Sequence, residues 1–141
     1  MKKSALLLAL ALSALPLAAK AELVSIQLQV SGVSPATGSI EASLFNSADT
    51  FMVEVLFQES GEVSEDGTFS ASFFGLEEGD YAIVVVHDAN DNGVYDTGFM
   101  GIGGESVAYS NGATSLLGRP GFEDASFSLD SPDQLVEISM D

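Results

Sequence analysis

The residues of this sequence best suited to chemistry are oxygen-bearing side chains at regular spacing near its middle. Asp88, Asn90 and Asn92 alternate with other residues, and Gly93 follows them directly. Calcium takes about six to eight oxygen ligands, and a calcium-binding loop supplies side chains from its positions 1, 3 and 5, with a glycine at position 6 for the sharp turn. The spacing therefore predicts a calcium site that begins at Asp88.

The remainder of this loop matches a calcium loop at two more positions and departs from it at the last. Val94 would offer its backbone carbonyl at position 7, and Asp96 lies at position 9. An EF-hand closes with a bidentate Glu at position 12, where this chain has Phe99, and it follows a helix, whereas the segment before Asp88 has the pattern of a strand. We therefore expect a calcium loop between strands, not an EF-hand.

The acid that would complete the calcium site must come from another part of the chain. Glu105 is the first candidate because it is the next acid downstream, and Glu123 and Asp124 are the second. A loop without its bidentate Glu predicts weak affinity, roughly tens of micromolar to millimolar. The same residues also fit a surface turn without an ion, because Asn and Asp cap backbone groups and tolerate left-handed conformations.

His87, the single histidine, lies directly before the loop and suggests an alternative hypothesis. With a loop acid and a serine it could serve a small hydrolase; the loop serines are Ser106, Ser110 and Ser115. The nearest approach to a Gly-x-Ser-x-Gly elbow, at 104–108, lacks the second glycine and its strand–turn–helix context. A catalytic triad is defined by geometry, and a lone histidine at a strand end is more often structural. We therefore expect no enzymatic activity.

The composition limits the partners and the chemistry. The chain has 141 residues, a formal net charge of −17 and a pI near 4.1, which disfavours nucleic acid because phosphate binding requires a basic surface. It has no cysteine, which excludes disulfides and thiolate sites. A hydrophobic share of 46% predicts a packed core. The expected partner is a protein or a glycan, and the sequence leaves the oligomeric state open.

Residues 1–21 have the organisation of a secretory signal peptide. Lys2 and Lys3 precede an apolar run over 5–17, and the small-x-small tripeptide 19–21 follows it. The apolar run is shorter than the roughly 20 residues that span a bilayer. We therefore expect cleavage after Ala21, no membrane insertion afterwards, and a periplasmic or secreted protein. The remaining 22–141 carries 21 acids against one base, Arg119, a charge of −20 that also fits a structural envelope protein adapted to salt.

Hydrophobic periodicity predicts about seven short strands and no long helix in residues 22–141. Period-two alternation indicates strands at 24–30, 40–44, 69–73, 125–129 and 136–140, and apolar runs indicate two more at 52–57 and 81–87. The run 81–87 is apolar on both faces and should be central. These strands predict a single antiparallel β-sandwich. The expected anchors between its sheets are Phe51, Phe57, Phe69, Phe73 and Tyr81.

Two connections are also predicted from turn residues. The tripeptide 65–67, Glu-Asp-Gly, is typical of a hairpin turn between strands. Residues 88–121 hold eight of the 14 glycines and form one long loop, with at most a short extra strand at 107–109. A loop of this length in a compact domain is usually functional, which is consistent with the calcium interpretation.

An ordered series of short motifs resembles a secreted bacterial family called domain of unknown function 2141. The motifs are Gly79-Asp80-Tyr81-Ala82, His87-Asp88-x-Asn90-x-Asn92-Gly93-x-x-Asp96, Phe99-Met100-Gly101-Ile102-Gly103-x-Glu105, Tyr109-Ser110-Asn111-Gly112-Ala113 and Gly118-x-Pro120-x-Phe122-x-x-Ala125. The family usually has proline at the place of Gly103. The resemblance implies export and one shared site for Asp88, Asn90, Asn92, Asp96 and Glu105. The strand signature Leu76-x-x-Gly79-x-Tyr81-x-Ile83 is similar to that of prealbumin-like and carboxypeptidase-regulatory-like sandwiches.

Overall fold

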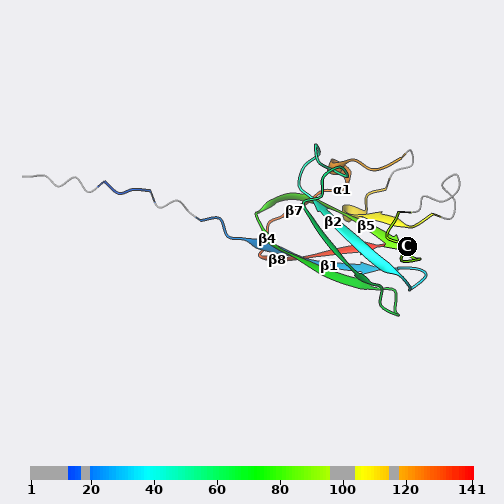
Figure 1. The fold of residues 1–141 in the computed structure, drawn as a ribbon. Coiled ribbons are helices and arrows are strands. Elements are labelled where there is room, and N and C mark those ends of the chain that lie inside the picture. Colours follow the sequence, from blue (N-terminus) through cyan, green and yellow to red (C-terminus); the bar gives the residue numbers. More distant parts are fainter. Residues whose placement is uncertain (1–12, 17–19, 96–103, 115–117) are drawn as a thin grey trace, which may run out of the picture.

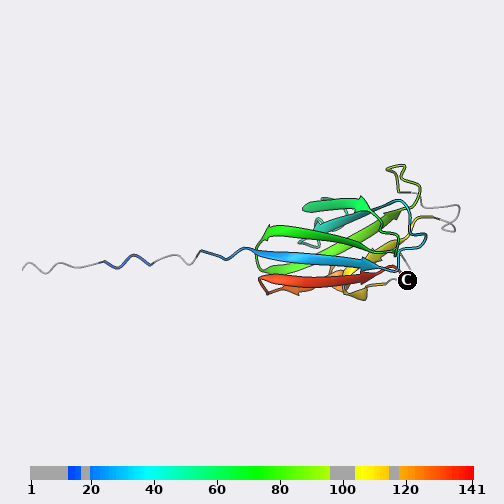
Figure 2. The same ribbon diagram turned by 90° about the horizontal axis from the view of Figure 1, so that it is seen from below.

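Eight strands in two sheets form the framework of the described residues. The computed structural model describes residues 13–16, 20–95, 104–114 and 118–141, and the account below concerns these residues. Figures 1 and 2 show the two sheets packed face to face, with the chain entering at one end of the sandwich and ending near the other. This arrangement confirms the predicted all-β sandwich.

The smaller sheet has three strands and the larger has five. The three strands lie in the order β4 (Phe69–Leu76), β1 (Val24–Ser31) and β8 (Asp133–Ser139). The larger sheet has the order β3 (Phe57–Glu62), β2 (Ser39–Phe45), β5 (Gly79–Asp88) and β6 (Val107–Tyr109), and β7 (Phe127–Leu129) also pairs with β5. A 3-10 turn η1 (Ser110–Gly112) and a short helix α1 (Phe122–Ala125) connect β6 to β7.

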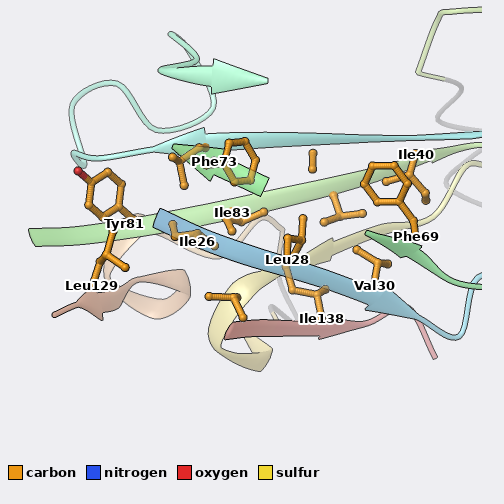
Figure 3. Close-up of a cluster of buried hydrophobic side chains, with 14 of the residues drawn as sticks. Ile26, Leu28, Val30, Ile40, Phe69, Phe73, Tyr81, Ile83, Leu129 and Ile138 are labelled. Carbon is orange, nitrogen blue, oxygen red and sulfur yellow. The ribbon is translucent and has the colours of Figure 1, made fainter. Parts of the chain in front are cut away.

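The core lies between the two sheets and follows from the period-two pattern. The inward residues of β1 are at most 5% exposed; inward residues of β2 and β5 meet them across the sandwich, and those of β4 lie beside them in the same sheet (Figure 3). Full burial of one such side chain, for example Leu28, contributes about 1.5–3 kcal/mol. Three of the predicted aromatic anchors belong to this cluster: Phe69, Phe73 and Tyr81.

The other two predicted anchors, Phe51 and Phe57, are not in that core. Phe57 is 47% exposed at the start of β3. Phe51 packs edge-on between Phe45 and Phe122, with ring centroids 5.3 and 5.8 Å away, and Phe45 is on the outward-facing side of β2. The loop 46–56 and α1 thus cover the outer face of the larger sheet, a second layer that period-two alternation does not reveal.

The predicted strand at 52–57 is wrong, because this segment forms a turn and a bend. The amides of Val53 and Glu54 both donate to the carbonyl of Thr50, which curls the chain before it can extend. The strand begins only at Phe57 and runs through the polar residues to Glu62. Likewise, the predicted strand at 125–129 is shorter: Ala125 ends α1, and only Phe127–Leu129 is extended.

Two connections differ from the simplest antiparallel pattern. The turn at 65–67 joins β3 to β4, but these strands lie in different sheets, so it is not a hairpin. The last strand, β8, runs parallel to β1, while the other strand pairs are antiparallel. The Ser25 amide donates to the Pro132 carbonyl at 3.0 Å, so β8 begins at the end of the sheet where β1 begins. The period-two alternation of a strand determines which of its faces is buried, but not whether the neighbouring strand runs parallel or antiparallel to it.

Most of the predicted signal segment, 1–21, lies outside the described residues. Within the described part, none of the helices has both the length and the apolar character that a membrane crossing requires.

Candidate metal centre

Asp88 is the last residue of β5, and the loop that follows it folds back over its carboxylate. The Gly93 amide donates to Asp88 Oδ2 at 2.7 Å, and the Asn92 amide donates to Asp88 Oδ1 at 3.2 Å. The Asp91 amide reaches the Asp88 carbonyl at 3.4 Å. The strand therefore fixes the position of Asp88, and its own side chain holds the beginning of the loop in a curl.

Each of the two asparagines accepts, through its side-chain oxygen, a hydrogen bond from the amide two residues later. The Asn92 amide also donates to Asn90 Oδ1 at 3.2 Å, and the Val94 amide donates to Asn92 Oδ1 at 2.9 Å. Gly93 has a φ of 73°, a left-handed conformation that glycine adopts without steric cost. The predicted sharp turn at this glycine is thus present, and the oxygens of Asp88, Asn90 and Asn92 belong to one compact loop.

The pKa of Asp88 is lowered, and Glu105 contributes to that shift. Desolvation raises the pKa of this carboxyl, but the hydrogen bonds it accepts from the amides of Gly93 and Asn92, together with a side-chain hydrogen bond with Glu105, outweigh desolvation and lower it. Glu105 itself is half-buried, and its Oε1 is shielded from solvent. The two acids at opposite ends of the loop therefore meet.

The position of Glu105 is set by the pairing of β5 with β6. Val86 of β5 lies opposite Val107, and the His87 amide donates to the Ser106 carbonyl at 2.9 Å, which continues the ladder beyond β6. Continuation of that antiparallel register leads the chain from Ser106 to Glu105 beside Asp88. The sequence indicated Glu105 only as the next acid downstream, and the sheet supplies the physical reason.

The other proposed ligands fall in different places. Val94 is in the loop and 62% exposed, and Asp96 lies outside the described residues. Asp124 accepts a hydrogen bond from the Gly121 amide at the start of α1. This helix packs near Ile83, five residues before Asp88 on β5, which is roughly 16 Å along a strand. The second-choice acids Glu123 and Asp124 are therefore not brought to the Asp88 loop.

A hollow of about 260 Å³ adjoins the two acids. Asp88, Glu105 and Tyr95 line it together with Glu41 of β2. No sequence signal points to Glu41, because only the register of β2 with β5 places it in this wall, opposite Val86. Among the residues that the structure describes, no three histidine or acidic side chains come close enough to hold a metal. Asp88 and Glu105 would thus need amide and backbone oxygens to complete an ion site.

His87 is buried and bonded to the backbone. Its side chain is 2% exposed, and its Nε2 donates to the Thr37 carbonyl at 2.8 Å. The Ser110 hydroxyl is also committed, because it accepts from the Ile83 amide at 2.8 Å and donates to the Ala125 carbonyl at 2.6 Å. Ser115 lies outside the described residues. The geometry around His87 is that of a structural histidine that fastens the 31–38 turn to β5.

The order and spacing of these loop residues agree with a known family. The family described as "Uncharacterized protein conserved in bacteria (DUF2141)" matches residues 28–137, well over half of the chain. The chain belongs to this family. The match includes both ends of the Asp88 loop and all strands except the beginning of β1 and the end of β8. Neither the curated proteins nor the solved structures gave a match.

Proposed function

We propose that this protein is an exported, non-enzymatic β-sandwich module that binds calcium through the loop at Asp88. The observation that carries the proposal is the placement of two acids from opposite ends of the loop, Asp88 and Glu105, in the wall of one hollow, beside the curl that holds Asn90 and Asn92. Two neighbouring carboxylates repel each other unless a proton or a cation lies between them. A divalent cation would neutralise both acids, which is the electrostatic reason to place one beside them.

The donor set favours calcium over other divalent ions. Every proposed ligand offers oxygen: Asp88, Asn90, Asn92, the Val94 carbonyl, Asp96 and Glu105. Zinc and other transition metals favour nitrogen or sulfur, and magnesium demands a near-ideal octahedron and retains its waters. A flexible loop of oxygen ligands suits the larger calcium ion. The bound ion would order the loop, which would then present a surface to a protein or glycan partner in the envelope.

The experiment that tests this proposal is a thermal melt of the purified protein with millimolar calcium, with chelator, and with sodium chloride at the ionic strength of the calcium sample. At about ten times Kd, calcium stabilises the folded state by about 1.4 kcal/mol, which raises Tm by several degrees. Calorimetric titration then gives the stoichiometry. If sodium chloride raises Tm as much as calcium does, the acidity is a general adaptation to salt and the proposal is wrong.

A matched pair of loop variants separates a specific site from general charge. Asp88→Asn removes one charge at the first ligand position, and Asp91→Asn removes one charge from an exposed position of the same loop. We expect Asp88→Asn to abolish the calcium-dependent rise in Tm and Asp91→Asn to retain it. Equal responses of the two variants would contradict the assignment of Asp88 as a ligand.

A further inference from the structure

The outer edge of β3 is an open sheet edge. β3 is the terminal strand of the larger sheet and pairs through residues 57–62 with β2 alone. No strand of the described residues pairs with its other side. An open edge exposes a row of backbone donors and acceptors, which is a template for another extended chain.

The register identifies the backbone groups on this edge. The Val63 amide donates to the Gly38 carbonyl at 3.0 Å, and these residues continue the β2–β3 register. In an antiparallel pair, successive residues direct their amide and carbonyl groups alternately toward the partner strand and away from it. Residues 57, 59 and 61 therefore face β2, whereas the backbone groups of Gln58, Ser60 and Glu62 face outward.

An exposed apolar segment leads directly into this edge. Val53, Val55, Leu56 and Phe57 are 84%, 43%, 40% and 47% exposed. Large apolar and β-branched residues of this kind favour strands, yet residues 53–56 form a turn and a bend. A shallow hollow beside this segment is lined by Asn46, Thr50, Glu54, Val55 and Leu56. The segment thus offers apolar contact area next to unused backbone hydrogen-bonding groups.

The charge of the same region specifies the occupant. Residues 53–66 contain five acids and no lysine or arginine; the acids are Glu54, Glu59, Glu62, Glu65 and Asp66. A second copy of this chain would bring glutamates of two β3 strands together, and like charges across a strand pair destabilise it. An extended segment with lysine or arginine and apolar side chains meets both the acidic and the apolar features of the edge.

We propose that the β3 edge binds an extended basic peptide segment of a partner protein as an added strand. The main chain of the peptide would bond to Gln58, Ser60 and Glu62. Its apolar residues would contact Val55 and Phe57 on one face of the strand, and its basic residues would lie near Glu62 on the opposite face. Main-chain bonds supply affinity in this mode, and alternate side chains supply specificity. This inference is independent of the calcium proposal.

The test uses a fluorescent, end-capped octapeptide that alternates lysine and valine, titrated into the purified protein in chelator. Its controls are the glutamate–valine octapeptide and a lysine–valine octapeptide with N-methyl groups on one edge. We expect saturable binding of the first peptide only. Hydrogen exchange of the complex should show new protection at the amides of Gln58, Ser60 and Glu62. Equal binding of the N-methylated peptide, or protection only at other strands, would overturn the proposal.

The matched variants are Ser60→Pro and Ser60→Ala. Proline removes the outward amide of Ser60 and no β2–β3 bond, and edge strands tolerate proline at such positions. Alanine keeps that amide. We expect Ser60→Pro to weaken peptide binding by roughly tenfold and Ser60→Ala to bind as the parent does. Equal affinities of the two folded variants would refute the added strand.

If Ser60→Pro does not fold, the double variant Glu59→Lys with Glu62→Lys tests the proposal instead. It leaves every backbone group of the edge in place and reverses the local charge. We expect its preference to change from the lysine–valine to the glutamate–valine octapeptide. An unchanged preference for the lysine peptide would show that binding occurs on another acidic surface, and the proposal would then be wrong.

Discussion

Replacement of Ser110 by alanine tests how the larger sheet is held together at its divided edge. β6 and β7 pair with the same side of β5, β6 with Val84–Val86 and β7 with Gly79–Tyr81, which leaves a gap between them. The Ser110 hydroxyl fills this gap: it accepts from the Ile83 amide at 2.8 Å and donates to the Ala125 carbonyl at 2.6 Å. One side chain thus substitutes for a missing strand residue.

The expected magnitude follows from the burial of these groups. Ser110 is 0% exposed, so water cannot replace its hydroxyl without rearrangement. Each buried backbone group left without a partner costs about 1–3 kcal/mol. Because Ser110→Ala orphans one donor and one acceptor, we expect a loss of about 2–6 kcal/mol in the free energy of unfolding. For a domain of this size that corresponds to a fall in Tm of roughly 8–24 °C.

The assay is denaturant and thermal unfolding of Ser110→Ala beside a matched control, Ser128→Ala. The Ser128 hydroxyl donates to the Asp80 carboxylate at 2.9 Å on the exposed surface, so its loss should change stability by less than about 0.5 kcal/mol. Hydrogen exchange gives a local readout, since the Ile83 amide should lose protection only in Ser110→Ala. Equal and small effects of both variants would refute the bridging role.

Three further predictions concern other single contacts. Tyr81→Phe removes the bond from the tyrosine hydroxyl to the Glu77 carbonyl at 2.8 Å and should cost about 1 kcal/mol in urea unfolding; an unchanged midpoint would contradict it. Gly38→Ala should prevent folding or lower Tm severely, because a Cβ there lies 2.1 Å from the Asp88 carbonyl oxygen at a φ of +78°; a native-like melt would show that the turn at Gly38 relaxes freely. The folded-state pKa of Asp88 is lowered, so its stabilising contribution is present above the unfolded pKa of about 3.9 and is lost as pH falls through the folded value. Without calcium, Asp88→Asn should therefore lose less stability than the parent between about pH 5 and pH 3. Parallel curves of unfolding free energy against pH would refute this.

Period-two alternation was sufficient to predict the strands whose one face is buried. Val24, Ile26, Leu28 and Val30 appear in the sequence as a half-buried strand, and they form the inward face of β1. Apolar pattern predicts a strand wrongly where local hydrogen bonds compete with an extended backbone, as at Thr50, whose carbonyl curls the apolar segment after it. It also could not identify the polar strand β3, which pairs with β2 through its backbone while its own side chains remain largely exposed.

For the site, spacing alone grouped Asp88, Asn90 and Asn92, because side chains two and four residues apart in a turn approach each other through local geometry. The turn that the spacing predicted at Gly93 is present, since its left-handed backbone depends on one residue. Glu105 was a choice among acids, because the sequence contains no information on which distant carboxylate reaches the loop. Whether calcium occupies these oxygens stays a prediction.

The sequence by itself determined the all-β class, the inward faces of the strands and the local curl of the Asp88 loop, because each depends on residues within a few positions of one another. Only the tertiary structure decided that β8 runs parallel to β1, that Ser110 joins β6 and β7 to one edge, and that Glu105 meets Asp88. These outcomes depend on strand order and register, which arise from contacts between residues far apart in the chain.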